Sequence, residues 1–192
     1  MTQLTLTASP RVLADAVPGG VVRDAVLVLG GAGLVGAAAQ VSVPLSFTPV
    51  PLTLQTVAVL LVGASLGTRR GVAALSLYLL AGVAGLPWFA HAGHGFGGAS
   101  FGYILGFWVS ALVVGRLAET GATRSAWKSA VTLLAGNAVV YVVGVPWLMA
   151  VAHVGLAKGL AIGVVPFLVG DAVKLAVASG LLPTAWKLTG RR

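Results

Sequence analysis

A run of 44 residues without a charged side chain, between Asp24 and Arg69, constrains the fold of this chain more than any other feature. The whole chain of 192 residues carries only 12 Lys or Arg and 4 Asp or Glu, which is 8%. Ordinary soluble domains carry about a quarter. Because a soluble domain must cover its surface with polar groups, this composition excludes a cytosolic enzyme and a nucleic-acid-binding module. It indicates a polytopic protein of the lipid bilayer.

The positions of prolines and charges divide the chain into spans. One membrane-spanning helix needs about 20 apolar residues, so the uncharged run holds two helices, separated by the three prolines of segment 43–51. The same reasoning along the rest of the chain predicts an all-α integral membrane protein with six transmembrane helices. They are expected at residues 25–43, 52–68, 71–90, 102–118, 130–150 and 160–184. Residues 25–187 then form one membrane domain between two short segments, 1–24 and 188–192.

Basic residues predict the orientation of the six helices. With six spans, ten of the 12 Lys and Arg fall on the side of the two termini, Lys158 falls on the other side, and Lys174 lies inside the last span. Because Lys and Arg are enriched in cytoplasmic loops, we expect both termini in the cytoplasm and the chain in the plasma membrane.

A glycine motif in the first span matches the sequence pattern of a dinucleotide-binding site. Gly31-Ala-Gly33-Leu-Val-Gly36 matches the dinucleotide-binding fingerprint, which requires an acidic residue about 20 positions later. After the motif, no Asp or Glu occurs before Glu119. Small residues spaced four apart let helices approach closely. Two such pairs occur here, Ala32 with Gly36 and Gly33 with Ala37. They favour packing within the bundle or, alternatively, a docking face for a partner protein. We expect no bound cofactor.

Two further motifs suggest hydrolysis or metal binding. Gly63-Ala-Ser65-Leu-Gly67 and Gly98-Ala-Ser100-Phe-Gly102 match a nucleophile elbow, and His91 and His94 precede Ser100. An intramembrane serine hydrolase is therefore an alternative, although Gly and Ser are common in membrane helices. The two histidines lack nearby acidic or Cys ligands, which disfavours a metal site. A channel or metal permease is a further alternative.

Asp171 and Lys174 are the most informative residues, because they are charged and lie inside the sixth span. Each costs about 2.5–3.5 kcal/mol at the centre of an isolated inserted helix. Their i,i+3 spacing places them on one face, and Phe167 lies one turn earlier. We interpret them as a ligand site facing the interior of the bundle rather than as a structural ion pair alone.

Other polar and aromatic residues near the outer ends of the spans complete a predicted pocket, lidded by the Gly-rich loop 91–100. These candidate ligand-binding residues are Asn137, Tyr141, Tyr103, Gln55, Thr53, Trp88 and Phe89. For the amides the alternative role is hydrogen bonding between helices, and for Tyr103 and Trp88 it is an interfacial aromatic belt.

Several motifs together resemble the BioY family of biotin transporters. They are Pro49-Val-Pro-Leu-Thr-Leu-Gln-Thr56, Gly85-Leu-Pro-Trp-Phe89, Gly102-Tyr-Ile-Leu-Gly-Phe107, Asn137-x3-Tyr141 with Gly144 and Trp147, and Pro166-Phe-x2-Gly-Asp171-x2-Lys174. The resemblance covers residues 25–187. Loop 91–100 departs most, with Ser100-Phe101 where many members have Pro-Thr.

The resemblance implies a function and partners. Members of this family are S components, the substrate-binding subunits of energy-coupling factor (ECF) transporters. The chain is then expected to capture extracellular biotin and to assemble with a transmembrane coupling protein and two ATP-binding subunits. It is not expected to be an enzyme. An S component for another vitamin is the nearest alternative.

Overall fold

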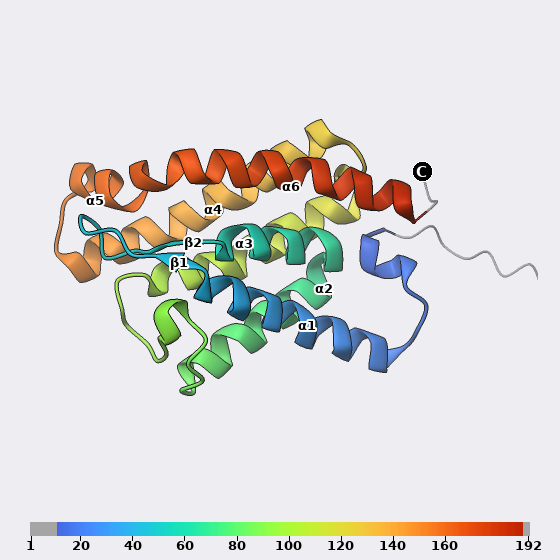
Figure 1. Cartoon of the computed structure of the whole chain (residues 1–192), viewed down its shortest axis with the longest axis horizontal. Helices are drawn as coiled ribbons and strands as arrows, with labels where there is room; N and C mark the ends of the chain where they lie inside the picture. Colours follow the sequence, from blue (N-terminus) through green and yellow to red (C-terminus); the bar gives the residue numbers. More distant parts are fainter. Residues whose placement is uncertain (1–10, 190–192) are drawn as a thin grey trace, which may run out of the picture.

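The computed structural model describes residues 11–189, which are helical except for two short strands and the connecting loops. Figure 1 shows the helices packed side by side in one elongated bundle. Within these residues, five helical stretches are long and apolar enough to cross a membrane. They are α1 (Val21–Gln40), α2 (Gln55–Val83), α3 (Phe101–Glu119), α4 (Ala126–Ala152) and the stretch Leu156–Leu188, which comprises α5 (Leu156–Gly163) and α6 (Leu168–Leu188).

Helix α2 is not straight, because the chain doubles back within it at Gly67. The backbone of Gly67 has φ of 78° and ψ of −176°, a conformation that is almost exclusive to glycine. Gln55 Nε2 donates a hydrogen bond to Tyr78 Oη at 2.8 Å, whereas 23 residues of straight helix would separate them by about 35 Å. Figure 1 shows the two halves of α2 running in opposite directions.

The reversal in α2 is supported by α3. Glu119 at the end of α3 accepts a hydrogen bond from the backbone N–H of Thr68, at 2.8 Å. Thr68 begins the second half of α2, so the carboxylate satisfies one of the donors that a helix N-terminus leaves without a partner. The Arg69-Arg70 pair, taken from the sequence as the end of a span, directly follows this reversal.

Two features of the helices depart most from the sequence-based boundaries. The helix expected to reach residue 90 ends at Val83, because Gly85 adopts φ of +110° and the chain turns there. The backbone N–H of Leu86 bonds to Ala81 O at 2.9 Å and that of Gly85 to Gly82 O at 3.2 Å, which is a Schellman cap. The last span is also interrupted, since Pro166 lies in a 3₁₀ turn, Val165–Phe167, between α5 and α6.

Short elements cap both ends of the bundle. At one end, β1 (Ser42–Val43) pairs antiparallel with β2 (Leu52–Thr53), which closes the proline-rich loop into a hairpin, and a 3₁₀ turn at Ala90–Ala92 lies in the loop after α2. At the other end lie the 3₁₀ turns Leu13–Ala16 and Ala122–Arg124.

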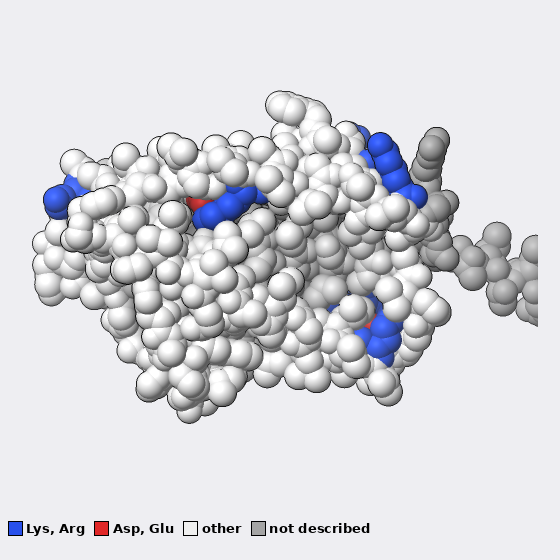
Figure 2. Space-filling view, viewed as in Figure 1, with Lys and Arg blue, Asp and Glu red and all other residues white. Residues whose placement is uncertain are grey.

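An ion cluster ties the start of the described chain to α1 and α2. Arg70 binds Asp15 at 2.8 Å and Asp24 at 2.9 Å. Although partial burial opposes ionisation, the hydrogen bond and charge of Arg70 hold the pKa of Asp15 below its usual value. The first described segment of the chain and the C-terminal end of α6 both lie at this end of the molecule (Figure 1). Figure 2 shows two patches of Lys and Arg at this end; the rest of the face is uncharged apart from one patch of basic and acidic atoms near its middle and one basic patch at the far end.

Candidate ligand-binding site

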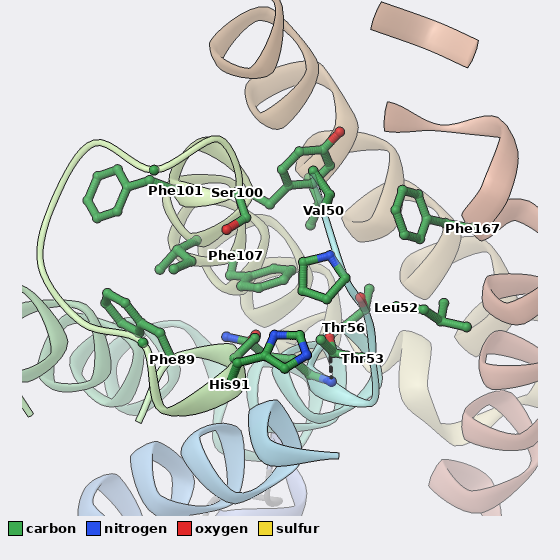
Figure 3. A pocket seen from close by; sticks show the side chains of 18 of the residues that line it. Val50, Leu52, Thr53, Thr56, Phe89, His91, Ser100, Phe101, Phe107 and Phe167 are labelled. Carbon is green, nitrogen blue, oxygen red and sulfur yellow. Dashed lines mark hydrogen bonds between the residues drawn. The ribbon is translucent and has the colours of Figure 1, made fainter. Parts of the chain in front are cut away.

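A cavity of about 240 Å³ lies at the end of the bundle that carries the β-hairpin. Its walls come from the hairpin loop, the start of α2, the loop after α2, α3, α4 and the start of α6. Figure 3 shows aromatic and aliphatic side chains converging on it from these separate elements. Segments that are far apart in sequence therefore build one site.

Asp171 is the centre of the polar side of this cavity. One of its carboxylate oxygens, Oδ2, accepts hydrogen bonds from Asn137 Nδ2 at 3.0 Å and from the Tyr141 hydroxyl. The other, Oδ1, accepts from Lys174 Nζ at 3.2 Å. Asp171 is only 5% exposed, and a buried carboxylate is stable only when it is paired and hydrogen-bonded. The three donors meet that requirement.

The helical spacings explain why these groups meet. Asn137 and Tyr141 are four residues apart and project from the same face of α4. Asp171 and Lys174 are three apart on α6, which packs against α4. Since Lys174 neutralises Asp171, the pair brings no net charge to the cavity.

The amide of Asn137 has an unused acceptor. Its Nδ2 bonds to Asp171, whereas its buried Oδ1 has no hydrogen-bond partner. A buried acceptor without a partner costs about 1–3 kcal/mol. This unpaired acceptor belongs to a side chain that lines the cavity.

Nine of the ten residues predicted from the sequence as ligand contacts line this one cavity. They are Thr53, Gln55, Phe89, Tyr103, Asn137, Tyr141, Phe167, Asp171 and Lys174. Some of them are already engaged with the protein: Tyr103 Oη donates to Gly163 O at 2.8 Å, and Gln55 donates to Tyr78.

Trp88 is the exception, since it does not line the cavity. Its indole Nε1 donates to Tyr78 O at 3.0 Å, and its ring occupies the space left by Gly36 of α1. The early end of α2 at Val83 places Trp88 in a loop rather than at a helix end, and the side chain turns inward between α1 and α2. The adjacent Phe89 packs on Gly82 and reaches the cavity.

The sequence had not placed several lining residues among the ligand contacts. The apolar ones include Val50, Leu52, Phe101, Ile104, Phe107 and Val140. Their apolar character does not distinguish them from core residues. His91 and His94 also line the cavity. The sequence placed them in the loop predicted to lid the pocket, but as individual side chains it considered them only for metal binding or hydrolysis. In Figure 3 His91 lies across the cavity from Phe167.

The remaining sequence motifs take part in packing. Gly31 and Gly36 are buried against α2 and Trp88, while Gly33 and Ala37 are exposed on the opposite face of α1. Ser65 lies within the first half of α2 and Ser100 precedes α3 after an irregular loop, so neither sits in the strand–turn–helix context of a nucleophile elbow. Within residues 11–189, no group of three metal-ligating side chains is found.

The fold and the cavity define a class: this is a multi-pass membrane protein whose helices enclose a cavity lined by a buried ion pair. The model of the BioY family matches residues 4–191. The chain belongs to the BioY family, whose curated members are transporters rather than enzymes.

Individual relatives agree with this assignment. The chain is 38% identical over 149 residues to the biotin transporter BioY of Thermotoga maritima, covering 76% of this chain and 85% of the relative. It is 36% identical over 148 residues to the probable biotin transporter BioY of Pyrococcus horikoshii, with the same coverage. A crystal structure of the S-component for biotin from an ECF-type ABC transporter shares the fold, with a TM-score of 0.79, 24% identity, and 86% of this chain and 92% of that chain covered.

Proposed function

We propose that this chain is the membrane-embedded S component that captures extracellular biotin for uptake by an ECF-type transporter. Membership of the BioY family supports this function. The observation that carries it is the arrangement around Asp171, where a buried carboxylate, an ammonium and an amide with an unpaired oxygen belong to side chains that line one cavity.

The ureido ring of biotin has the complementary groups. It offers two N–H donors and one carbonyl acceptor. Asp171 and the free Oδ1 of Asn137 can each accept one N–H, and Lys174 can donate to the carbonyl. Since all three groups are held by α4 and α6, the ring binds without further ordering of the protein.

The rest of the cavity suits the apolar part of biotin. Phe89, Tyr103 and Phe167 line it together with the aliphatic residues of the hairpin loop. These walls match the fused rings, the thioether and the methylene chain. We leave Trp88 out of this set, because its ring packs between α1 and α2.

We further propose six membrane crossings with both termini in the cytoplasm, the two halves of α2 counting as separate spans. The reversal at Gly67 and the gathering of basic residues at one end support this topology. The cavity then opens at the outer side. The coupling protein and the ATP-binding subunits would act from within the membrane and the cytoplasm, and Gly33 and Ala37, exposed on α1, offer them a close-contact surface.

Equilibrium binding of biotin to the purified protein tests this function directly. Asp171→Asn and Lys174→Ala should each weaken binding roughly 30-fold or more, because removing one partner of a buried pair leaves the other uncompensated. Lys158→Ala is the matched control, since Lys158 is exposed on α5 and does not line the cavity.

Other results would identify a different function. Undiminished affinity in both cavity variants would refute the residue assignment. Displacement of a bound ligand by thiamin or riboflavin, with none by biotin, would indicate an S component for another vitamin. Labelling by a fluorophosphonate that is lost in Ser100→Ala would indicate a serine hydrolase.

A further inference from the structure

The charges of the cavity do not by themselves balance a carboxylate ligand. Four of its lining side chains belong to acidic or basic residue types: Asp171, Lys174, His91 and His94. Asp171 and Lys174 compensate each other at 3.2 Å. Biotin carries a carboxylate at the end of its aliphatic chain, and an anion without a partner is costly to remove from water. Among the described residues that line the cavity, the histidines are therefore the groups able to supply an additional positive charge.

The loop that carries these histidines is held in place from three sides. Gln40 of α1 donates to Trp88 O and Phe89 O and accepts from the backbone N–H of Ala92. Gly95 N donates to Gly82 O of α2 at 2.8 Å. Trp147 of α4 donates to Gly98 O at 3.0 Å. The imidazoles are thus presented by an ordered loop.

The backbone of the loop is left-handed at His91, with φ of 58° and ψ of 40°, and at the adjacent Ala92, with φ of 53°. Histidine adopts this conformation more readily than most residues other than glycine. The turn places His91 among the residues that line the cavity.

We propose that His91 and His94 form an anion subsite at the mouth of the cavity that binds the carboxylate of biotin. The proposal rests on the proposed function and extends it, because it assigns the second end of the ligand. It makes the protein selective for the free acid over neutral derivatives such as biotinamide. It also makes the affinity for biotin rise in mild acid.

The pH dependence follows from the groups that face the subsite. The side chains that anchor the loop, Gln40 and Trp147, carry no charge. The other titratable groups of the cavity are Asp171, Lys174, Tyr103 and Tyr141. Among these side-chain types only histidine ordinarily changes its charge between pH 6 and pH 8. Imidazolium binds a carboxylate through charge-assisted hydrogen bonds, so affinity should increase as the pH falls.

The test compares biotin with biotinamide at pH 6 and pH 8, by titration of the wild type and the double variant His91→Asn, His94→Asn. Asparagine tolerates the left-handed backbone and stays neutral. At pH 6 the variant should bind biotin roughly tenfold more weakly and lose the pH dependence. Its affinity for biotinamide should be unchanged, which also reports correct folding.

His153→Asn is the matched control. His153 also has a left-handed backbone, with φ of 53°, but it caps α4 and does not line the cavity, so this variant should behave as the wild type. Equal weakening of biotin and biotinamide, or wild-type binding of biotin that does not vary between pH 6 and pH 8, would overturn the proposal. If the wild type bound neither ligand, the proposed function itself would fail.

Discussion

At the scale of single residues, the position of Asp171 depends on donors from two helices. Tyr141→Phe removes the hydroxyl that donates to Asp171 Oδ2 and leaves the bonds from Asn137 and Lys174. Because the buried carboxylate loses a partner and its fixed orientation, we expect biotin affinity to fall about tenfold. Equilibrium binding measures this change.

Tyr103→Phe is the control for that substitution, since it removes a hydroxyl from another aromatic ring of the cavity. The Tyr103 hydroxyl donates to Gly163 O and not to Asp171. The loss leaves a backbone carbonyl without its partner, so thermal stability should fall while biotin affinity changes little. Equal losses of affinity in the two variants would contradict the role assigned to Tyr141.

The sequence predicts an individual site residue when inserting that side chain into a membrane costs much free energy. Asp171 and Lys174 stand out because charge is rare inside a span. The i,i+4 spacing of Asn137 and Tyr141 predicts a shared face, but not that this face meets Asp171. That meeting depends on the rotation of α4 against α6, which is set by packing.

At the scale of elements, the reversal of the chain within α2 depends on one glycine, Gly67. Gly67→Ala forces a side chain onto a backbone with φ of 78°, and the new methyl group would lie 3.0 Å from Glu119 Oε1 and 3.3 Å from Val12 Cγ1. We expect a loss of about 1–3 kcal/mol of stability. Thermal unfolding in detergent measures it.

Gly30→Ala provides the comparison for the reversal in α2. Gly30 lies within α1 with helical geometry, and nothing lies within 4 Å of an added methyl group. Alanine there should be neutral or slightly stabilising, because it favours the helix by up to about 1 kcal/mol. If Gly67→Ala melted at or above the wild-type temperature, the reversal would not require glycine.

The sequence predicts the existence of elements better than their ends. Arg69-Arg70 correctly indicated an interruption near residue 68, because charges end apolar runs. The end of α2 at Val83 depends on the Schellman cap at Gly85. Gly85 followed by Pro87 is a helix-stop signal, but the sequence-based boundary followed the apolar run past it. The division between α5 and α6 was likewise hidden by continuous hydropathy, although Pro166 marks it.

At the scale of the whole molecule, topology is decided by whether α2 crosses the membrane once or twice. Charge counting predicted two crossings from the ten-to-one distribution of loop Lys and Arg. The fold adds that the halves of α2 are antiparallel and that the first described segment and the C-terminal end of α6 lie at the same end of the bundle. Both features favour an even number of crossings.

Single cysteines can test the number of crossings, because the chain has no native Cys. Ser46→Cys, Thr120→Cys and Lys158→Cys place thiols at exposed positions in the hairpin loop, the α3–α4 connection and α5. With six crossings, the thiols at 46 and 158 face outward and the thiol at 120 faces the cytoplasm. A membrane-impermeant maleimide added to intact cells should therefore label the first two and not the third.

A single crossing by α2 gives a different pattern, which makes the experiment decisive. Positions 46 and 120 would then share one side, and position 158 would lie on the other. The relation among the three sites does not depend on the absolute orientation, so it tests the reversal at Gly67 separately from the positive-inside rule. Labelling at 46 and 158 but not at 120 also places the cavity at the outer surface, because the hairpin loop that carries Ser46 forms part of its wall. Biotin would then enter from outside, as capture by an S component requires.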